Sequence, residues 1–194
     1  MKNTVIKFTS KLILLAGLFM IATAFTPKHT GDKYMTKNGK VTFFSHTDLE
    51  DIKADNNKVS SVLDTKSGKM VIEVLIKSFV FKKARMEEHF NENYMESTKY
   101  PKSKFDGKID DLKAINFSKD GIYKSSVSGN LTLKNKTNAV KTTGTFTIKN
   151  GKLNGKATFK VKPADYNITI PAVVKDKIAK EVEVTVDLDY SPFK

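Results

Sequence analysis

The chain has no cysteine, one arginine (Arg85) and three scattered histidines (His29, His46 and His89). Without cysteine, disulfides, thiol chemistry, cysteine-based metal sites and lipid attachment through a cysteine are all excluded. The histidines lack the close spacing that metal ligands show, so we expect no metal.

Sequence motifs for catalysis are also missing. There is no G-x-S-x-G elbow, no P-loop and no G-x-G-x-x-G. Paired carboxylates such as Asp110-Asp111 and Glu87-Glu88 are adjacent in sequence, as surface or strand-end charges are. We therefore expect no enzyme and no cofactor. A hydrolase or isomerase would need a clustered, buried set of ionisable groups.

The N-terminus has the features of an export signal. Basic residues precede an apolar run over residues 12–21, and an A-x-A pattern follows at 22–24. The run is shorter than the roughly 20 residues of a transmembrane helix. We predict a signal peptide over 1–24, with an uncleaved anchor as the alternative, and a periplasmic or secreted protein. A flexible segment over 25–38 and a single barrel domain over 39–194 would follow.

The formal charge is +13 and comes almost entirely from lysine. Nucleic-acid binding is disfavoured, because base readout and bidentate phosphate contacts rely on arginine. Dispersed lysines are typical of a solvated surface. Transient attraction to an anionic membrane is the alternative, at about 1 kcal/mol per well-placed lysine. We expect a monomer or a homodimer.

Alternation of apolar and polar residues dominates the rest of the chain, as in Ala157, Phe159 and Val161 between lysines and a threonine. This period of two is typical of antiparallel strands with one buried face. About eight strands are predicted, near residues 40–46, 51–63, 69–79, 104–111, 121–135, 138–149, 152–162 and 181–190. Turn signals separate them, at Asn38-Gly39, Ser67-Gly68, Asp120-Gly121 and Asn150-Gly151.

Residues 82–95 break this pattern with good helix formers, and Met86, His89, Phe90 and Asn93 share one helical face. Pro101 then restores an extended chain. A second, shorter helical piece is expected over 172–179.

Eight such strands can close into a barrel, which removes exposed edges and can hold one small ligand. The fold class is therefore mainly β, an antiparallel eight-stranded barrel with one short helix near its mouth. Alternation alone leaves a solid core and a ligand cavity equally open. The inner face would include Val74, Ile76, Phe105, Ile109, Leu131, Leu133, Phe146, Ile148, Phe159, Val161, Val184, Val186 and Leu188.

Candidate ligand contacts come from this inner face and from the helix beside it. The twelve candidates are Phe81, Arg85, Met86, His89, Phe90, Phe105, Leu131, Leu133, Phe146, Phe159, Val161 and Tyr166. Arg85 and His89 are one helical turn apart and could hydrogen-bond a ligand head group. Alternatively, Arg85 pairs with Glu88 or Asp165 and only fixes the helix.

Several segments, in order, resemble motifs of one family. They are Ser78-Phe79 with Lys83–Phe90, then Tyr94-Met95 and Tyr100-Pro101 through Phe105, then Gly129–Leu133 with Thr137, and finally Asp165–Ile168. The set resembles the YceI-like family of bacterial lipid-binding barrels. Asn135 and Asn167 replace glycines of the family pattern, which asparagine allows because it tolerates left-handed backbone.

This resemblance implies an exported, lipocalin-like barrel with a long cavity for polyisoprenoid or other amphiphilic ligands. We therefore expect a lipid carrier or buffer, with a role in stress as one option and a bound isoprenoid in place of a cofactor. The alternative is a filled barrel whose basic surface acts as an envelope adhesion or interaction module.

Overall fold

The computed structural model describes residues 32–193, and the predicted signal peptide over 1–24 lies outside this range. Nine strands, four 3₁₀ segments, one α-helix and one π-helical turn follow one another along the described chain. The strands are β1 (Lys33–His46), β2 (Asp51–Asp64), β3 (Lys69–Leu75), β4 (Val80–Phe81), β5 (Lys102–Ile109), β6 (Gly121–Leu133), β7 (Lys136–Lys149), β8 (Lys152–Val161) and β9 (Val182–Phe193). The helical segments are η1 (Ile76–Ser78), α1 (Ala84–His89), the π turn η2 (Phe90–Tyr94), η3 (Leu112–Ala114), η4 (Pro163–Tyr166) and η5 (Ala172–Lys177).

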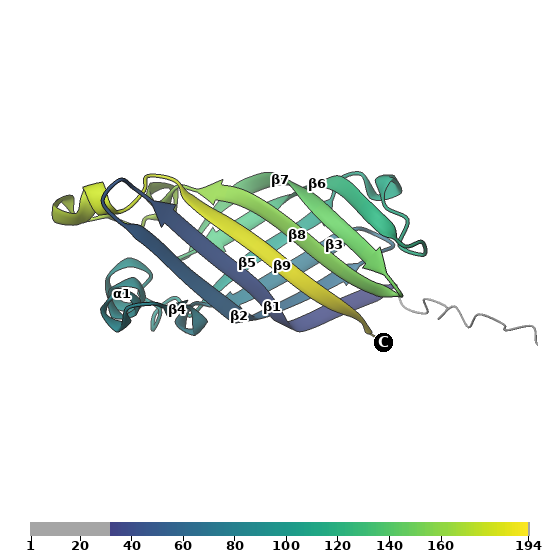
Figure 1. Cartoon of the computed structure of the whole chain (residues 1–194), viewed down its shortest axis with the longest axis horizontal. Helices are drawn as coiled ribbons and strands as arrows, with labels where there is room; N and C mark the ends of the chain where they lie inside the picture. The colour runs from purple at the N-terminus through teal and green to yellow at the C-terminus, as the bar shows by residue number, and fades with distance from the viewer. Residues whose placement is uncertain (1–31, 194) are drawn as a thin grey trace, which may run out of the picture.

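The strands form one closed antiparallel barrel. Their order is β1-β9-β8-β7-β6-β5-β3-β2-β4, and an additional β1–β2 pairing closes the ring. β4 is an extra short strand that pairs only with β2, at Ala54↔Phe81 and Asp55↔Val80. Figure 1 shows the long tilted strands wrapping around the barrel. The predicted fold class, an eight-stranded lipocalin-like barrel with a short helix at its mouth, is confirmed.

The two ends of the barrel differ. α1 and β4 lie at one end, with the yellow-green coil of η5 near them, whereas the chain reaches its C-terminus at the opposite end (Figure 1). At the terminal end the inward side chains pack solidly, and their exposed fractions are 0–4%. This plug consists of Tyr34, Val59, Leu63, Ile109, Ile148, Leu153 and Tyr190.

The β1 strand corrects two predictions. Residues 33–38 belong to this strand, so the expected flexible segment over 25–38 and the domain start at 39 are wrong there. Asn38-Gly39 forms no turn but a bulge, at which the pairing with β2 shifts register on both sides of Gly39. The bulge accommodates close packing, because a Cβ on Gly39 would clash with Cδ2 of Leu188.

Elsewhere the predicted turns divide into two groups. Gly68, Asn150 and Gly151 have positive φ, as turn residues do. Asn135 and Asn167 adopt φ of 61° and 56°, so both take the left-handed conformation expected where the family pattern has glycine. Asp120-Gly121 instead leads directly into β6, which begins at Gly121.

The third predicted strand ends early. β3 stops at Leu75, and the chain turns through η1, where the Ile76 amide donates to the Pro101 carbonyl over 2.9 Å. The helix predicted over 82–95 is present as α1 and the π turn η2, and the second helical piece is η5.

Candidate functional site

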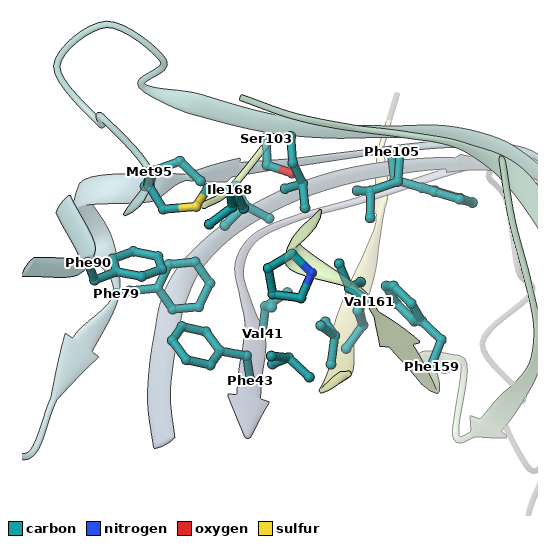
Figure 2. Close-up of a pocket in the computed structure, with 18 of the residues that line it drawn as sticks. Val41, Phe43, Phe79, Phe90, Met95, Ser103, Phe105, Phe159, Val161 and Ile168 are labelled. Atoms are coloured by element: carbon teal, nitrogen blue, oxygen red, sulfur yellow. The ribbon is translucent and has the colours of Figure 1, made fainter. Parts of the chain in front are cut away.

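An apolar cavity of about 560 Å³ fills the part of the barrel that the plug leaves open. This volume is within the range of about 300–1,000 Å³ that is usual for small-molecule pockets. Valine, isoleucine, leucine and phenylalanine make up most of the wall. Figure 2 shows Val41, Phe43, Phe105, Phe159, Val161 and Ile168 around the hollow, from strands on opposite sides and from the loop after η4.

The sequence left a solid core and a cavity open, and each is present in one part of the barrel. Ile109 and Ile148, which we expected on the inner face, belong to the packed core and do not line the cavity. The other eleven inner-face residues do line it. Alternation predicted correctly which side chains point inward. It could not predict which of them pack against side chains from the opposite side of the barrel and which border the cavity.

Four phenylalanines hold the helical segment onto the barrel mouth. Phe90, at the start of η2, stacks on Phe43 of β1 with 5.4 Å between ring centroids. The same ring lies 5.5 Å from Phe79 and 5.1 Å from Phe81. Figure 2 shows Phe43, Phe79 and Phe90 grouped on one side of the cavity. Edge-to-face and stacked pairs of this kind contribute beyond their buried area, so α1 and η2 form a fixed part of the wall.

Eleven of the twelve predicted contact residues lie on the cavity wall: Phe81, Arg85, Met86, His89, Phe90, Phe105, Leu131, Leu133, Phe146, Phe159 and Val161. These side chains could therefore contact a ligand in the cavity, and that contact stays a prediction.

Tyr166 is the exception, because it does not line the cavity. Its side chain lies in η4, is 3% exposed and packs in a small cluster with Leu131 and Val161. Burial raises the pKa of this phenol. Tyr166 therefore supports the wall from behind, and its placement as a ligand contact was wrong.

Sequence reasoning missed part of the wall. Val41 and Phe43 of β1, and Ile168 and Ile170 after η4, all line the cavity. Both pairs have the i, i+2 spacing of an inward face, so the same signal could have found them. Val41 and Phe43 lie within the strand predicted over 40–46 but were not included in its inner face, and Ile168 and Ile170 follow a 3₁₀ segment rather than lying in a strand.

Charged groups on the wall are found mainly at the mouth. Glu50, at the end of the β1–β2 turn, forms an ion pair with Lys83, with 3.1 Å between Oε1 of Glu50 and Nζ of Lys83. Arg85 and His89 of α1 line the cavity and are exposed, and Lys177 of η5 does the same. Among residues 32–193, Arg85 forms no ion pair with Glu88 or Asp165, so the expectation that it only fixes the helix is not met.

Few of the side chains that line the cavity are polar, and the Tyr190 hydroxyl at its deep end is hydrogen-bonded. Tyr190 belongs to the plug and borders the cavity. Its hydroxyl is 2.7 Å from Oγ of Ser61, which itself donates to the Val71 carbonyl over 2.9 Å. The tyrosine hydroxyl is therefore the donor in that pair. Burial raises the pKa of Tyr190 to about 12. Lys156 of β8, the charged wall residue that lies outside the mouth segments, pairs with Asp187 at 3.4 Å.

Between residues 32 and 193, no group of three histidine, aspartate or glutamate side chains could hold a metal ion. Over the same range, no helix is long and apolar enough to cross a bilayer.

A closed antiparallel barrel with an apolar hollow and a helical segment at its mouth is the architecture of lipocalin-like proteins. Comparison with known families is more specific. The sequence model of the YceI-like domain matches residues 29–190, and the chain belongs to this family. No curated protein sequence matches the chain.

Solved structures share the fold at low sequence identity. A polyisoprenoid-binding domain from Saccharophagus degradans, implicated in plant cell wall breakdown, has a TM-score of 0.73 at 14% identity, over 84% of this chain and all of that one. BcnA from Burkholderia cenocepacia has a TM-score of 0.65 at 17% identity, over 79% and 96% of the two chains. A YceI protein from Campylobacter jejuni has a TM-score of 0.54 at 18% identity, over 77% and 89%.

Proposed function

We propose that the protein binds one isoprenoid or other long-chain amphiphile inside the barrel and acts as its carrier or buffer. The observation that carries this proposal is the apolar cavity of about 560 Å³. The fold is shared with a domain described as polyisoprenoid-binding, which adds support for an isoprenoid chain. A stress-related role is one use of such a buffer.

The physics of the cavity favours exchange over trapping. Burying a methylene group from water is worth about 0.8 kcal/mol, so a long tail would bind strongly relative to water. A membrane lipid already has its tail in hydrocarbon, however, and gains only the difference between two apolar surroundings. The protein would therefore take lipid from membranes and return it.

We further propose export to the periplasm or beyond the cell, on the strength of the N-terminal sequence pattern over residues 1–24. Transient membrane contact fits this location. Leu49 in the β1–β2 turn and Val173 in η5 are 67% and 89% exposed, and both lie on segments at the cavity mouth. Apolar tips there would bring the mouth to a bilayer. The oligomeric state, monomer or homodimer, stays a prediction.

Binding and not catalysis is the proposed activity. The wall of the described cavity consists mainly of aliphatic and aromatic groups, and most of its charged residues are found at the mouth. General acid–base chemistry would need ionisable groups positioned around a substrate inside.

The alternative is an envelope adhesion module that uses the basic exterior and holds no ligand. Its premise of a filled barrel disagrees with the cavity. Co-sedimentation with anionic liposomes at low and high salt separates the two ideas. Binding that vanishes with salt and ignores lipid tail length would favour adhesion, because screening weakens only the electrostatic attraction.

The test of lipid binding has two parts. The protein is purified from bacteria without detergent, extracted with organic solvent, and the extract is analysed by mass spectrometry. The melting temperature is then followed with added geranylgeraniol. At a hundred times Kd, binding adds about 2.7 kcal/mol, which raises Tm by about 5–10 °C for a domain of this size. No lipid in repeated extracts, together with an unchanged Tm, would refute the proposal.

A further inference from the structure

We infer that the cavity mouth selects amphiphiles with an anionic head group, a phosphate or a carboxylate, which Arg85 and Lys177 bind from two sides. The inference rests on the proposed function, because the tail must occupy the cavity before the head can reach the mouth. It goes beyond that function by naming the head-group chemistry.

The first observation is the division of charge on α1 and η2. Arg85, Met86, His89 and Phe90 face the barrel cavity. The acidic residues of the same segment, Glu87 and Glu88 between Met86 and His89 and Glu92 after Phe90, do not line the cavity and instead line a separate surface depression. A helix that is merely solvated has no need to separate its charges in this way. The separation leaves the cavity side of this segment cationic.

The second observation concerns ion pairing at the mouth. Glu50 is the only carboxylate on the described cavity wall, and it is paired with Lys83 at 3.1 Å. Glu87 is also engaged, since its Oε2 accepts the Phe81 amide at 3.2 Å. Within residues 32–193, Arg85 and Lys177 form no ion pair. Two cations at the mouth thus lack an anion.

The third observation places the two cations around a common opening. Lys83, just before α1, binds Glu50, and the Ala179 amide, just after η5, donates to Oγ of Ser45 over 2.8 Å. The β1–β2 hairpin end therefore contacts the segments that carry Arg85 and Lys177. Phe90, at the start of η2, and Ile178, directly after Lys177, also line the cavity.

An amphiphile whose tail fills the apolar hollow would leave its head at this position. The planar guanidinium of Arg85 can donate two parallel hydrogen bonds to a phosphate or carboxylate, and the ammonium of Lys177 adds a point charge. His89, one turn after Arg85, adds a ring N–H. An alcohol head offers none of these charge-assisted bonds.

The test compares three ligands with the same tail: geranylgeranyl phosphate, the matching geranylgeranyl carboxylic acid and geranylgeraniol. Affinity is measured below the critical micelle concentration by displacement of the neutral dye N-phenyl-1-naphthylamine. The variant R85Q/K177Q is compared with K82Q/K175Q. The control pair removes the same charge from a position just before α1 and one within η5, and both positions are exposed and do not line the cavity.

We expect the wild-type protein and K82Q/K175Q to bind the phosphate, the acid or both at least about tenfold more tightly than the alcohol, as charge-assisted hydrogen bonds imply. In R85Q/K177Q that ratio should fall to near one. The phosphate and acid results identify which anion is preferred.

Three results would overturn the inference. Equal affinity for all three ligands in the wild-type protein would refute head-group selection while leaving lipid binding intact. Equal loss of the ratio in both double variants would assign it to overall charge. Failure of every ligand to bind would refute the proposed function itself.

Discussion

Replacing Ala157 with phenylalanine should narrow the cavity and weaken lipid binding while leaving the barrel folded. Ala157 lies on the inward face of β8, opposite Gly144 on β7 and Val186 on β9, and all three line the cavity. An added phenyl ring would project into a space that the wild-type protein leaves to a ligand. The alanine methyl group makes no polar interaction, so the substitution removes no side-chain hydrogen bond.

The size of the effect follows from contact area. A buried phenylalanine covers roughly 150–250 Å² of surface. If the new ring takes about 150 Å² of wall from the ligand, the loss is about 3.8 kcal/mol at 25 cal/mol per Å². That corresponds to about 500-fold in Kd. A ligand that shifts within the cavity would keep part of this contact and lose at least about tenfold.

Affinity for geranylgeraniol is measured by dye displacement and stability by thermal melting. The control is Thr158→Phe, because Thr158 is the next residue on the strand and is exposed. We expect Ala157→Phe to lose affinity while its apo Tm stays within about 3 °C of wild type or rises, and Thr158→Phe to bind normally. Unchanged affinity in a folded Ala157→Phe protein would show that the ligand is not held in the cavity.

Three other substitutions test the site and the core. Burial raises the pKa of Tyr190 to about 12, against about 10 in the unfolded chain. The folded protein therefore favours the neutral phenol. The contribution of Tyr190 to the free energy of unfolding is fully present below pH 10 and falls by about 3 kcal/mol between about pH 10 and 12, because the phenol of the unfolded chain ionises first. Tyr190→Phe removes the hydrogen bond to Ser61, so its free energy of unfolding at pH 7 should be about 1 kcal/mol lower than that of the wild type. In urea unfolding at alkaline pH, the free energy of unfolding of the variant should fall less steeply with pH than that of the wild type. Parallel curves would contradict this. Phe159→Asp would place an unpaired carboxylate on the apolar wall. Circular dichroism should show an unfolded barrel, or dye displacement should show no ligand uptake. A stable variant with normal uptake would show that the β8 register is wrong. Phe79→Ala removes a 6% exposed ring that contacts Phe43 and Phe90 and should cost about 3–5 kcal/mol in chemical denaturation; a cost below about 1 kcal/mol would mean that the four-ring cluster does not fix the helical segment.

Sequence alternation predicted the strands well because each has one wet face and one dry face. The pattern failed where the chain departs from regular pairing. Residues 37–40 contain Asn38-Gly39 between lysines and read as a turn, yet the β1 bulge absorbs them within a continuous strand. β3 ended before Phe79 because the backbone turns through η1 to bond Pro101, a tertiary contact invisible in local sequence.

The candidate site was predicted mostly from which side chains face inward. What could not be predicted is the boundary between plug and cavity. Ile109 and Ile148 follow the same alternation as Phe105 and Phe146, yet only the latter two border empty space. The difference depends on which large side chains meet across the barrel, such as Tyr34 and Leu153 in the plug. Charge separation on α1 was likewise hidden, because it depends on which side of the helix contacts the barrel.

Native mass spectrometry of the protein, purified without detergent from cells that supply membrane lipid, tests the central claim most directly. We predict a population heavier than the bare chain by the mass of a single lipid, present in Thr158→Phe and missing from Ala157→Phe. A bare mass in every preparation, unchanged after incubation with isoprenoid vesicles, would contradict the assignment of the cavity to a lipid.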